Sequence, residues 1–144
     1  MDREQGKIEL VNETDRYIYP IGYEARVRMK VVQIEDEYYP MGYRVVTEDL
    51  KSLGLRENPN ILQYPIGEWF CLPSEDVVWG EDDWGGIWLA RTEGKAWEYR
   101  KYMREKHSTE ARVFKAAMGQ ILYCNRSGRI KTDAICMFEE IYRE

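Results

Sequence analysis

The chain of 144 residues is poor in the residues that metal sites and many catalytic sites require. It has one histidine, His107, and three cysteines that form no CxxC pair. A tetrahedral zinc site is usually built from four His and Cys ligands with CxxC-type spacing, which this chain barely supplies, so we expect no metal site. His107 falls in the last turn of a predicted helix, where a positive imidazole suits the helix end. The sequence therefore disfavours zinc chemistry and histidine-assisted nucleophilic catalysis.

Long apolar runs, a leader and the common nucleotide motifs are also missing. No segment approaches the ~18 consecutive apolar residues of a membrane helix. The polar start MDREQGK has no apolar core of a signal peptide. There is no P-loop, no GxGxxG motif and no HExxH motif. We therefore expect a cytoplasmic protein with no membrane partner, and, in the absence of a linker, one domain over residues 1–144.

Charge is distributed unevenly along the chain, whose net charge is −5. Residues 1–83 carry 9 basic and 18 acidic side chains, whereas residues 84–144 carry 12 basic and 8 acidic ones. Two interpretations stay open: surfaces of opposite charge that pair within the fold, or a local basic surface that attracts phosphate. The high charged fraction, 33%, also fits a thermophilic source.

Alternation of apolar and polar residues predicts the strands. The clearest is EARVRMKVV, residues 24–32, with Val27 and Met29 on the core face and Arg26 and Arg28 on the outer face. Three copies of a Tyr-Pro-x-Gly turn each precede an apolar stretch. Further short strands are predicted at residues 43–46, 68–72 and 86–90.

Two helices are predicted from capping residues. Thr47 is the expected N-cap of a short helix that ends at Gly54, with its leucines facing inward. Thr92 caps the principal helix, roughly Glu93 to Lys106. Four residues at offsets of three and four form its expected core side: Ala96, Tyr99, Tyr102 and Met103.

The last third of the chain fits strands or helices. Residues 112–124 and 129–138 alternate, but Ala, Lys and Met also favour a helix. Gly119 and the turn NRSG favour two strands. If these pair as a hairpin, Cys124 and Cys136 come near each other, and we expect reduced, buried thiols. The resulting fold class is α+β: a curved, mostly antiparallel, split sheet of about six to seven strands with one short and one long helix.

The segment WGEDDWGGIW admits two interpretations. It is a turn between strands, with the carboxylates supplying turn hydrogen bonds. Alternatively it is a pocket rim, where Trp79 and Trp84 stack a planar ring and the glycine pair beginning at Gly85 admits close backbone approach. Asp82 or Asp83 would then accept hydrogen bonds from a ribose or a base.

Arg44 interrupts the apolar strand GYRVV. A charge among such neighbours must reach water, a carboxylate or a ligand phosphate. Alternation alone gives it an outward position that needs no ligand. In the ligand interpretation, Arg44 and Tyr64 join the residues of the pocket rim.

Arg26, Arg28 and Lys30 form a basic face on the predicted strand 24–32. Such a face pairs with carboxylates on neighbouring strands. It also resembles the phosphate-contacting faces of sheets that bind nucleic acid. Both interpretations stay open.

The segments YRVVTEDLKSLGL, YPIGEWF, GGIWLARTEGKAWEYRKYM, RVFKAAMGQILY and RIKTDAICMFEEI carry a resemblance. Their order resembles a group of small uncharacterised phage and archaeal proteins, and is similar to the mono-ADP-ribosyltransferase fold over about residues 38–144. The resemblance implies NAD in the cleft of a split sheet. It matches Arg44 to an arginine that contacts NAD phosphate, and Glu139 or Glu140 to the catalytic glutamate. The chain lacks the Ser-Thr-Ser run and the Glu-x-Glu signature of that family, so whether it is an enzyme stays open.

Two function hypotheses follow. One is a nucleotide- or NAD-binding domain, with or without activity. The other is an accessory protein of viral or archaeal origin that binds nucleic acid or a protein partner through its basic face. Salt dependence distinguishes them, since binding to a phosphate backbone weakens steeply with salt.

Overall fold

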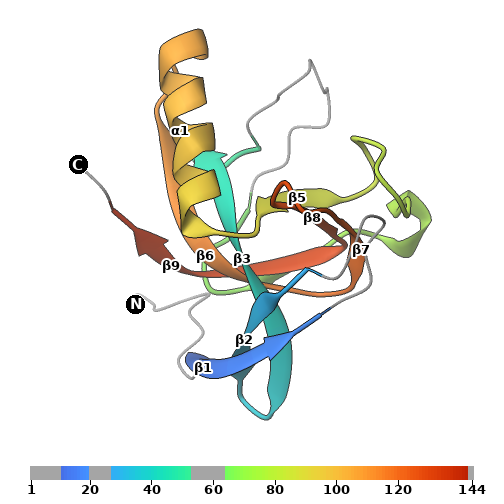
Figure 1. Cartoon of the computed structure of the whole chain (residues 1–144). Helices are drawn as coiled ribbons and strands as arrows, with labels where there is room; N and C mark the ends of the chain where they lie inside the picture. Colours follow the sequence, from blue (N-terminus) through green and yellow to red (C-terminus); the bar gives the residue numbers. More distant parts are fainter. Residues whose placement is uncertain (1–10, 20–26, 53–63, 143–144) are drawn as a thin grey trace.

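The computed structural model describes residues 11–19, 27–52 and 64–142, which form an α+β fold with nine strands and one α-helix (Figure 1). In chain order the elements are β1 (Val11–Ile18), β2 (Met29–Ile34), β3 (Glu37–Thr47), β4 (Trp69–Cys71), the 3-10 turn η2 (Ser74–Asp76), β5 (Ile87–Ala90), α1 (Glu93–His107), β6 (Ala111–Met118), β7 (Ile121–Cys124), β8 (Arg129–Thr132) and β9 (Ala134–Ile141). Within these residues, no helix has the length and apolar character needed to cross a membrane.

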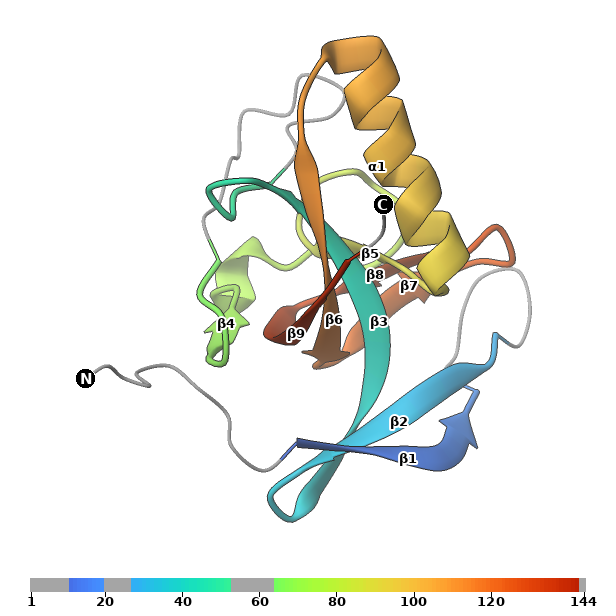
Figure 2. The same ribbon diagram turned by 90° about the vertical axis from the view of Figure 1, so that its left-hand side faces the viewer.

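The strands form one curved, mostly antiparallel sheet in the order β4-β9-β6-β3-β5-β8-β7. The long strand β3 pairs with β2 through its first half and with β6 through its second half. The β1–β2 hairpin therefore projects as an arm from the body of the sheet, and α1 packs along β6 and β3 (Figures 1 and 2). The prediction of a curved α+β sheet is confirmed, with more strands and one helix fewer than expected.

The two segments predicted in the last third are strands, each broken once. Residues 111–124 bend at Gly119, and residues 129–141 bend at Asp133. The bends face each other, because the backbone N–H of Gln120 donates to Asp133 Oδ1 at 2.8 Å. A Cβ at Gly119 would lie 2.6 Å from that oxygen, so a side chain there would displace the Asp133 carboxylate. As a result β6 pairs with β9, whereas β7 pairs with β8.

The strand predicted at residues 24–32 begins and ends later in the chain than expected. Val27 and Met29 are buried and Arg28 is exposed, as predicted. The strand itself begins at Met29 and continues to Ile34, where Glu35 turns the chain with a positive φ of 56°. Arg26 lies outside the described residues.

The short helix predicted after Thr47 is wrong, since residues 48–52 form a closed turn. Thr47 N–H donates to the Lys51 carbonyl at 2.9 Å, and Thr47 Oγ1 accepts from Lys51 N–H at 3.0 Å. Leu50 adopts the left-handed conformation, φ 66°. The threonine hydroxyl therefore closes a turn instead of capping a helix. The predicted end of the helix, Gly54, lies outside the described residues.

The principal helix is confirmed. Thr92 Oγ1 accepts a hydrogen bond from Lys95 N–H, and Ser108 ends the helix in the left-handed conformation. Ala96 and Met103 are buried as predicted. Trp97 is buried as well, although the predicted core side did not include it. The core side is rotated because α1 packs against Val45 and Val113 of the sheet.

The cysteines of the last third are buried free thiols, and Cys71 is exposed. The bends separate them in the sheet: Cys124 pairs with Ile130, and Cys136 pairs with Ala117. Burial raises the pKa of the Cys136 thiol to about 12. Neither thiol is positioned for the chemistry of a reactive thiolate.

Candidate functional site

The structure brings Arg44 and Tyr64 together in the interior. Arg44 is only 8% exposed, so the outward position that alternation suggested is wrong. Its Nη1 donates to the Trp88 carbonyl at 2.6 Å and its Nη2 donates to the Tyr64 hydroxyl at 3.1 Å. Within the described residues no carboxylate pairs with Arg44, and its buried Nε has no acceptor. The guanidinium is thus held by neutral oxygen atoms.

Trp88 connects this pair to the predicted pocket rim. Its indole N–H donates to the Asp83 carbonyl at 3.1 Å, while its own carbonyl accepts from Arg44. The Arg129 guanidinium lies 4.0 Å from the centre of the Trp88 ring. Trp79 and Trp84 are exposed, as a rim requires and as a plain turn also permits. Hydrogen bonds of Trp88 therefore connect Arg44 with Asp83 of the predicted ligand set.

Lys131 is a residue that sequence reasoning missed. It is fully buried beneath the loop that precedes β5, and its Nζ donates to the Gly80 carbonyl at 3.1 Å. Desolvation lowers the pKa of Lys131, against the opposing effect of the nearby carboxylates Asp82 and Asp83. Alternation in β8 would leave this lysine outward, and only the covering loop buries it.

The predicted basic face is partly neutralised. Lys30 Nζ lies 3.3 Å from Glu13 of the neighbouring strand, and Glu13 also pairs with Lys115 at 2.6 Å. Arg28 is exposed and its guanidinium lies 3.6 Å from the centre of the Tyr17 ring. Cross-strand pairing with a carboxylate therefore accounts for Lys30, whereas Arg28 stacks on an aromatic ring.

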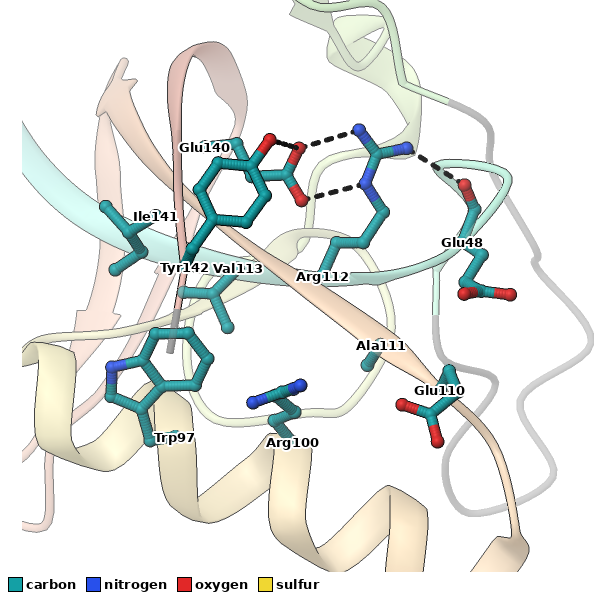
Figure 3. A pocket seen from close by; sticks show the side chains of 10 residues that line it. All are labelled: Glu48, Trp97, Arg100, Glu110, Ala111, Arg112, Val113, Glu140, Ile141 and Tyr142. Atoms are coloured by element: carbon teal, nitrogen blue, oxygen red, sulfur yellow. Dashed lines mark hydrogen bonds and ion pairs between the residues drawn. The ribbon is translucent and has the colours of Figure 1, made fainter. Parts of the chain in front are cut away.

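A groove of about 540 Å³ lies between α1, β6 and the end of β9 (Figure 3). We call it the α1–β9 groove. Its lining combines apolar, aromatic and charged side chains: Glu48, Trp97, Arg100, Glu110, Ala111, Arg112, Val113, Glu140, Ile141 and Tyr142. Sequence reasoning identified only Glu140, through the family resemblance. The other residues come from elements far apart in the chain.

A bidentate ion pair forms one side of the groove. Arg112 donates from Nε and Nη2 to the two carboxylate oxygens of Glu140, at 3.0 and 2.8 Å, and from Nη1 to the Glu48 carbonyl at 3.0 Å. The Tyr142 hydroxyl donates to the same carboxylate at 3.1 Å. The hydrogen bonds from Arg112 hold the pKa of Glu140 below its ordinary value. Glu140 is therefore a fixed carboxylate.

The helix forms the opposite side. Figure 3 shows β6 crossing the view, with Arg112 on one side and Trp97 and Arg100 of α1 on the other. Trp97 is 7% exposed and its indole N–H donates to Glu93 at 2.9 Å. The Arg100 guanidinium lies 5.2 Å from the Trp97 ring centre. The groove thus brings together two arginines, two aromatic rings and a fixed glutamate.

Register relates this groove to the interior Arg44. Arg44 pairs with Phe114 of β6, and Phe114 pairs with Glu140 of β9. Arg44 and Glu140, two of the three residues that the resemblance singles out, therefore lie in one row of the sheet, with β6 between them. Two strand spacings separate their Cα atoms by about 10 Å, and the buried Phe114 fills the space between them.

Comparisons with protein-family models, with curated proteins and with solved structures find no match to this chain. Among the described residues, no group of three or more His, Cys, Asp or Glu side chains is placed to hold a metal ion.

Proposed function

We propose that this domain binds a small nucleotide-like ligand in the α1–β9 groove and performs no chemistry on it. The observation that carries the proposal is the convergence of Arg100, Arg112, Trp97 and Tyr142 on one hollow of about 540 Å³. Sites for small organic ligands typically enclose ~300–1,000 Å³ and combine apolar walls with a few polar groups. The resemblance to the ADP-ribosyltransferase fold points to the same class of ligand.

Each part of a nucleotide has a counterpart in the groove. Tyr142, 82% exposed, offers a ring face on which a base stacks. Arg100 faces the groove from α1, and a guanidinium suits the planar, bidentate recognition of phosphate. Arg112 is paired with Glu140 and shapes the wall, and Arg100 adds a second guanidinium to the groove lining.

The state of Glu140 supports binding without catalysis. A catalytic carboxylate must be able to approach the reacting sugar or accept its proton. Glu140 accepts hydrogen bonds from Arg112 and Tyr142 on its two oxygens, and its lowered pKa keeps it ionised. It serves as an anchor for the groove wall.

Calorimetric titration with ADP-ribose, NAD and AMP tests the proposal. Tyr142→Ala and Arg100→Ala should each weaken binding roughly tenfold, as expected for loss of one stacked base or one charged phosphate contact. The matched controls are Tyr102→Ala and Lys101→Ala, which remove an exposed tyrosine and a cation from α1 outside the groove lining. The proposal fails if no nucleotide binds, or if the controls weaken binding as much as the groove variants.

The β1–β2 arm favours a second candidate, binding of single-stranded nucleic acid. Arg28 stacks on Tyr17, and Arg16 lies 4.5 Å from the centre of the Tyr38 ring. Both tyrosines are exposed. Exposed aromatic rings beside arginines are typical of platforms for unpaired bases. A labelled oligonucleotide should then bind with a steep salt dependence, and Tyr17→Ala and Tyr38→Ala should each weaken the binding through loss of stacking; binding that these variants leave unchanged would eliminate this candidate.

A further inference from the structure

The loop of residues 78–86, which we call the indole loop, is held in one conformation by its backbone. The N–H of Val78 donates to the Gly85 carbonyl at 2.9 Å, and the N–H of Gly80 donates to the Leu122 carbonyl at 3.2 Å. Gly85 has a φ of +82°, and a Cβ there would lie 2.3 Å from Val78 Cβ. A side chain at position 85 would therefore prevent this closure.

Polar contacts fix the inner face of the indole loop onto the sheet. Lys131 Nζ donates to the Gly80 carbonyl, and the Trp88 indole donates to the Asp83 carbonyl. Gly86 lies directly over the lysine, since a Cβ there would come within 2.5 Å of Lys131 Cε. The glycine pair thus allows the loop to close over a buried lysine.

The outer face of the indole loop is aromatic. Trp79 and Trp84 are 57% and 59% exposed. They are the next residues inside the Val78–Gly85 hydrogen bond, so both lie at the base of the loop. A rigid loop that buries a lysine and exposes two indoles has the character of an interaction surface, because exposed apolar patches mark such surfaces.

The charge around the two indoles determines the kind of partner. Residues 73–86 contain five carboxylates and no basic residue. Glu81 and Asp82 are exposed, and among the described residues neither has an ion-pair partner within 4 Å. Asp83 lies 3.9 Å from Arg129. This field repels phosphate and attracts cations, so it does not suit a nucleotide or a nucleic acid.

We propose that the indole loop binds an arginine- or lysine-rich segment of another protein. A guanidinium or ammonium group stacks on Trp79 or Trp84, and neighbouring basic side chains pair with Glu81 and Asp82. Tryptophan is the best aromatic partner for a cation, and arginine forms such stacks most often. This surface is separate from the α1–β9 groove and does not depend on what the groove binds.

Fluorescence anisotropy with a dye-labelled hexa-arginine peptide tests the proposal. The native chain should bind the peptide, and Trp79→Ala and Trp84→Ala should each weaken binding about 2- to 30-fold, the range expected for loss of one cation–π contact. The double variant Glu81→Gln/Asp82→Asn should weaken it by a similar factor. Circular dichroism should show an unchanged fold, because all four side chains are exposed.

The matched control is Asp36→Asn/Glu37→Gln, which removes the same charge from the exposed turn between β2 and β3. It should leave the affinity unchanged. If the control weakens binding as much as the loop double variant, the attraction is only that of the acidic chain and the proposal is overturned. Unchanged binding by the tryptophan variants, equal affinity for spermine, or no binding of the peptide would also overturn it.

Discussion

The α1–β9 groove and the indole loop both combine tryptophan with carboxylates, yet the pairing of these carboxylates differs. In the groove, Arg112 pairs with Glu140 and Arg104 pairs with Glu110 at 2.9 Å. In the indole loop, Glu81 and Asp82 have no such partners among the described residues. Tryptophans beside carboxylates therefore do not define a class of ligand by themselves. The class depends on whether those carboxylates already pair with cations of the protein.

The largest expected difference is between the effects of removing a groove tryptophan and a loop tryptophan on the stability of the chain. Trp97 is buried against Val45 and Val113, whereas Trp84 is exposed. Trp97→Ala should destabilise the chain by about 3–5 kcal/mol, which lowers Tm by roughly 10 °C for a domain of this size. Trp84→Ala should change the free energy of unfolding by no more than ~0.5 kcal/mol. Thermal unfolding of both variants measures this, and a large loss for Trp84→Ala would make that side chain part of the core.

The rigidity of the indole loop should depend on one glycine. Gly85→Ala forces a side chain into a left-handed conformation against Val78, so we expect a loss of about 2–3 kcal/mol. Gly94→Ala is the matched control, since a Cβ at this helical position meets no atom within 4 Å. That substitution should be neutral or stabilise by up to ~1 kcal/mol. Equal effects of the two substitutions in urea unfolding would show that the closure of the loop is not specific.

The groove wall should be sensitive to acid. Because the folded-state pKa of Glu140 is depressed below its ordinary value of 4.5, its contribution is complete at neutral pH and is lost as the pH falls through the folded pKa. Glu140→Gln should cost about 1–2 kcal/mol at pH 7. The difference from the native chain should shrink as the pH falls below the ordinary glutamate pKa of 4.5.

Glu139→Gln is the control for this pH dependence. Glu139 is more exposed and lies 3.6 Å from Lys115, so its loss should cost clearly less. The interpretation of Glu140 as an ionised anchor would be wrong if the cost of Glu140→Gln were independent of pH between 7 and 3.

Local patterns were sufficient for much of the fold. The burial of Val27 and Met29 follows from alternation, and the start of α1 follows from Thr92. The bends at Gly119 and Asp133 did not follow, because alternation continues on both sides and the bends depend on contact between the two segments. The short helix predicted after Thr47 failed for a related reason. A threonine hydroxyl can cap a helix or close a turn, and the conformation of the following residues determines which of the two forms.

The candidate site was less predictable. The alternation of residues in β3 predicts an outward Arg44. Both faces of β3 are covered in the structure, however, and this covering depends on the complete sheet. Arg112 and Glu140 meet through the register of β6 on β9, and Arg100 faces them because α1 packs beside β6. Register is set by tertiary contacts and turn geometry, which one sequence does not specify.

The central claim is that the groove binds a nucleotide and the indole loop binds a basic peptide. The most direct test is the ¹⁵N–¹H spectrum of the five tryptophan indoles, recorded during titration with ADP-ribose and then with hexa-arginine. ADP-ribose should shift the indole signal of Trp97 and leave those of Trp79 and Trp84 in place. Hexa-arginine should shift Trp79 and Trp84 and leave Trp97 unchanged. The account is contradicted if ADP-ribose moves the signals of the indole loop, or if it leaves the signal of Trp97 unmoved at saturating concentration.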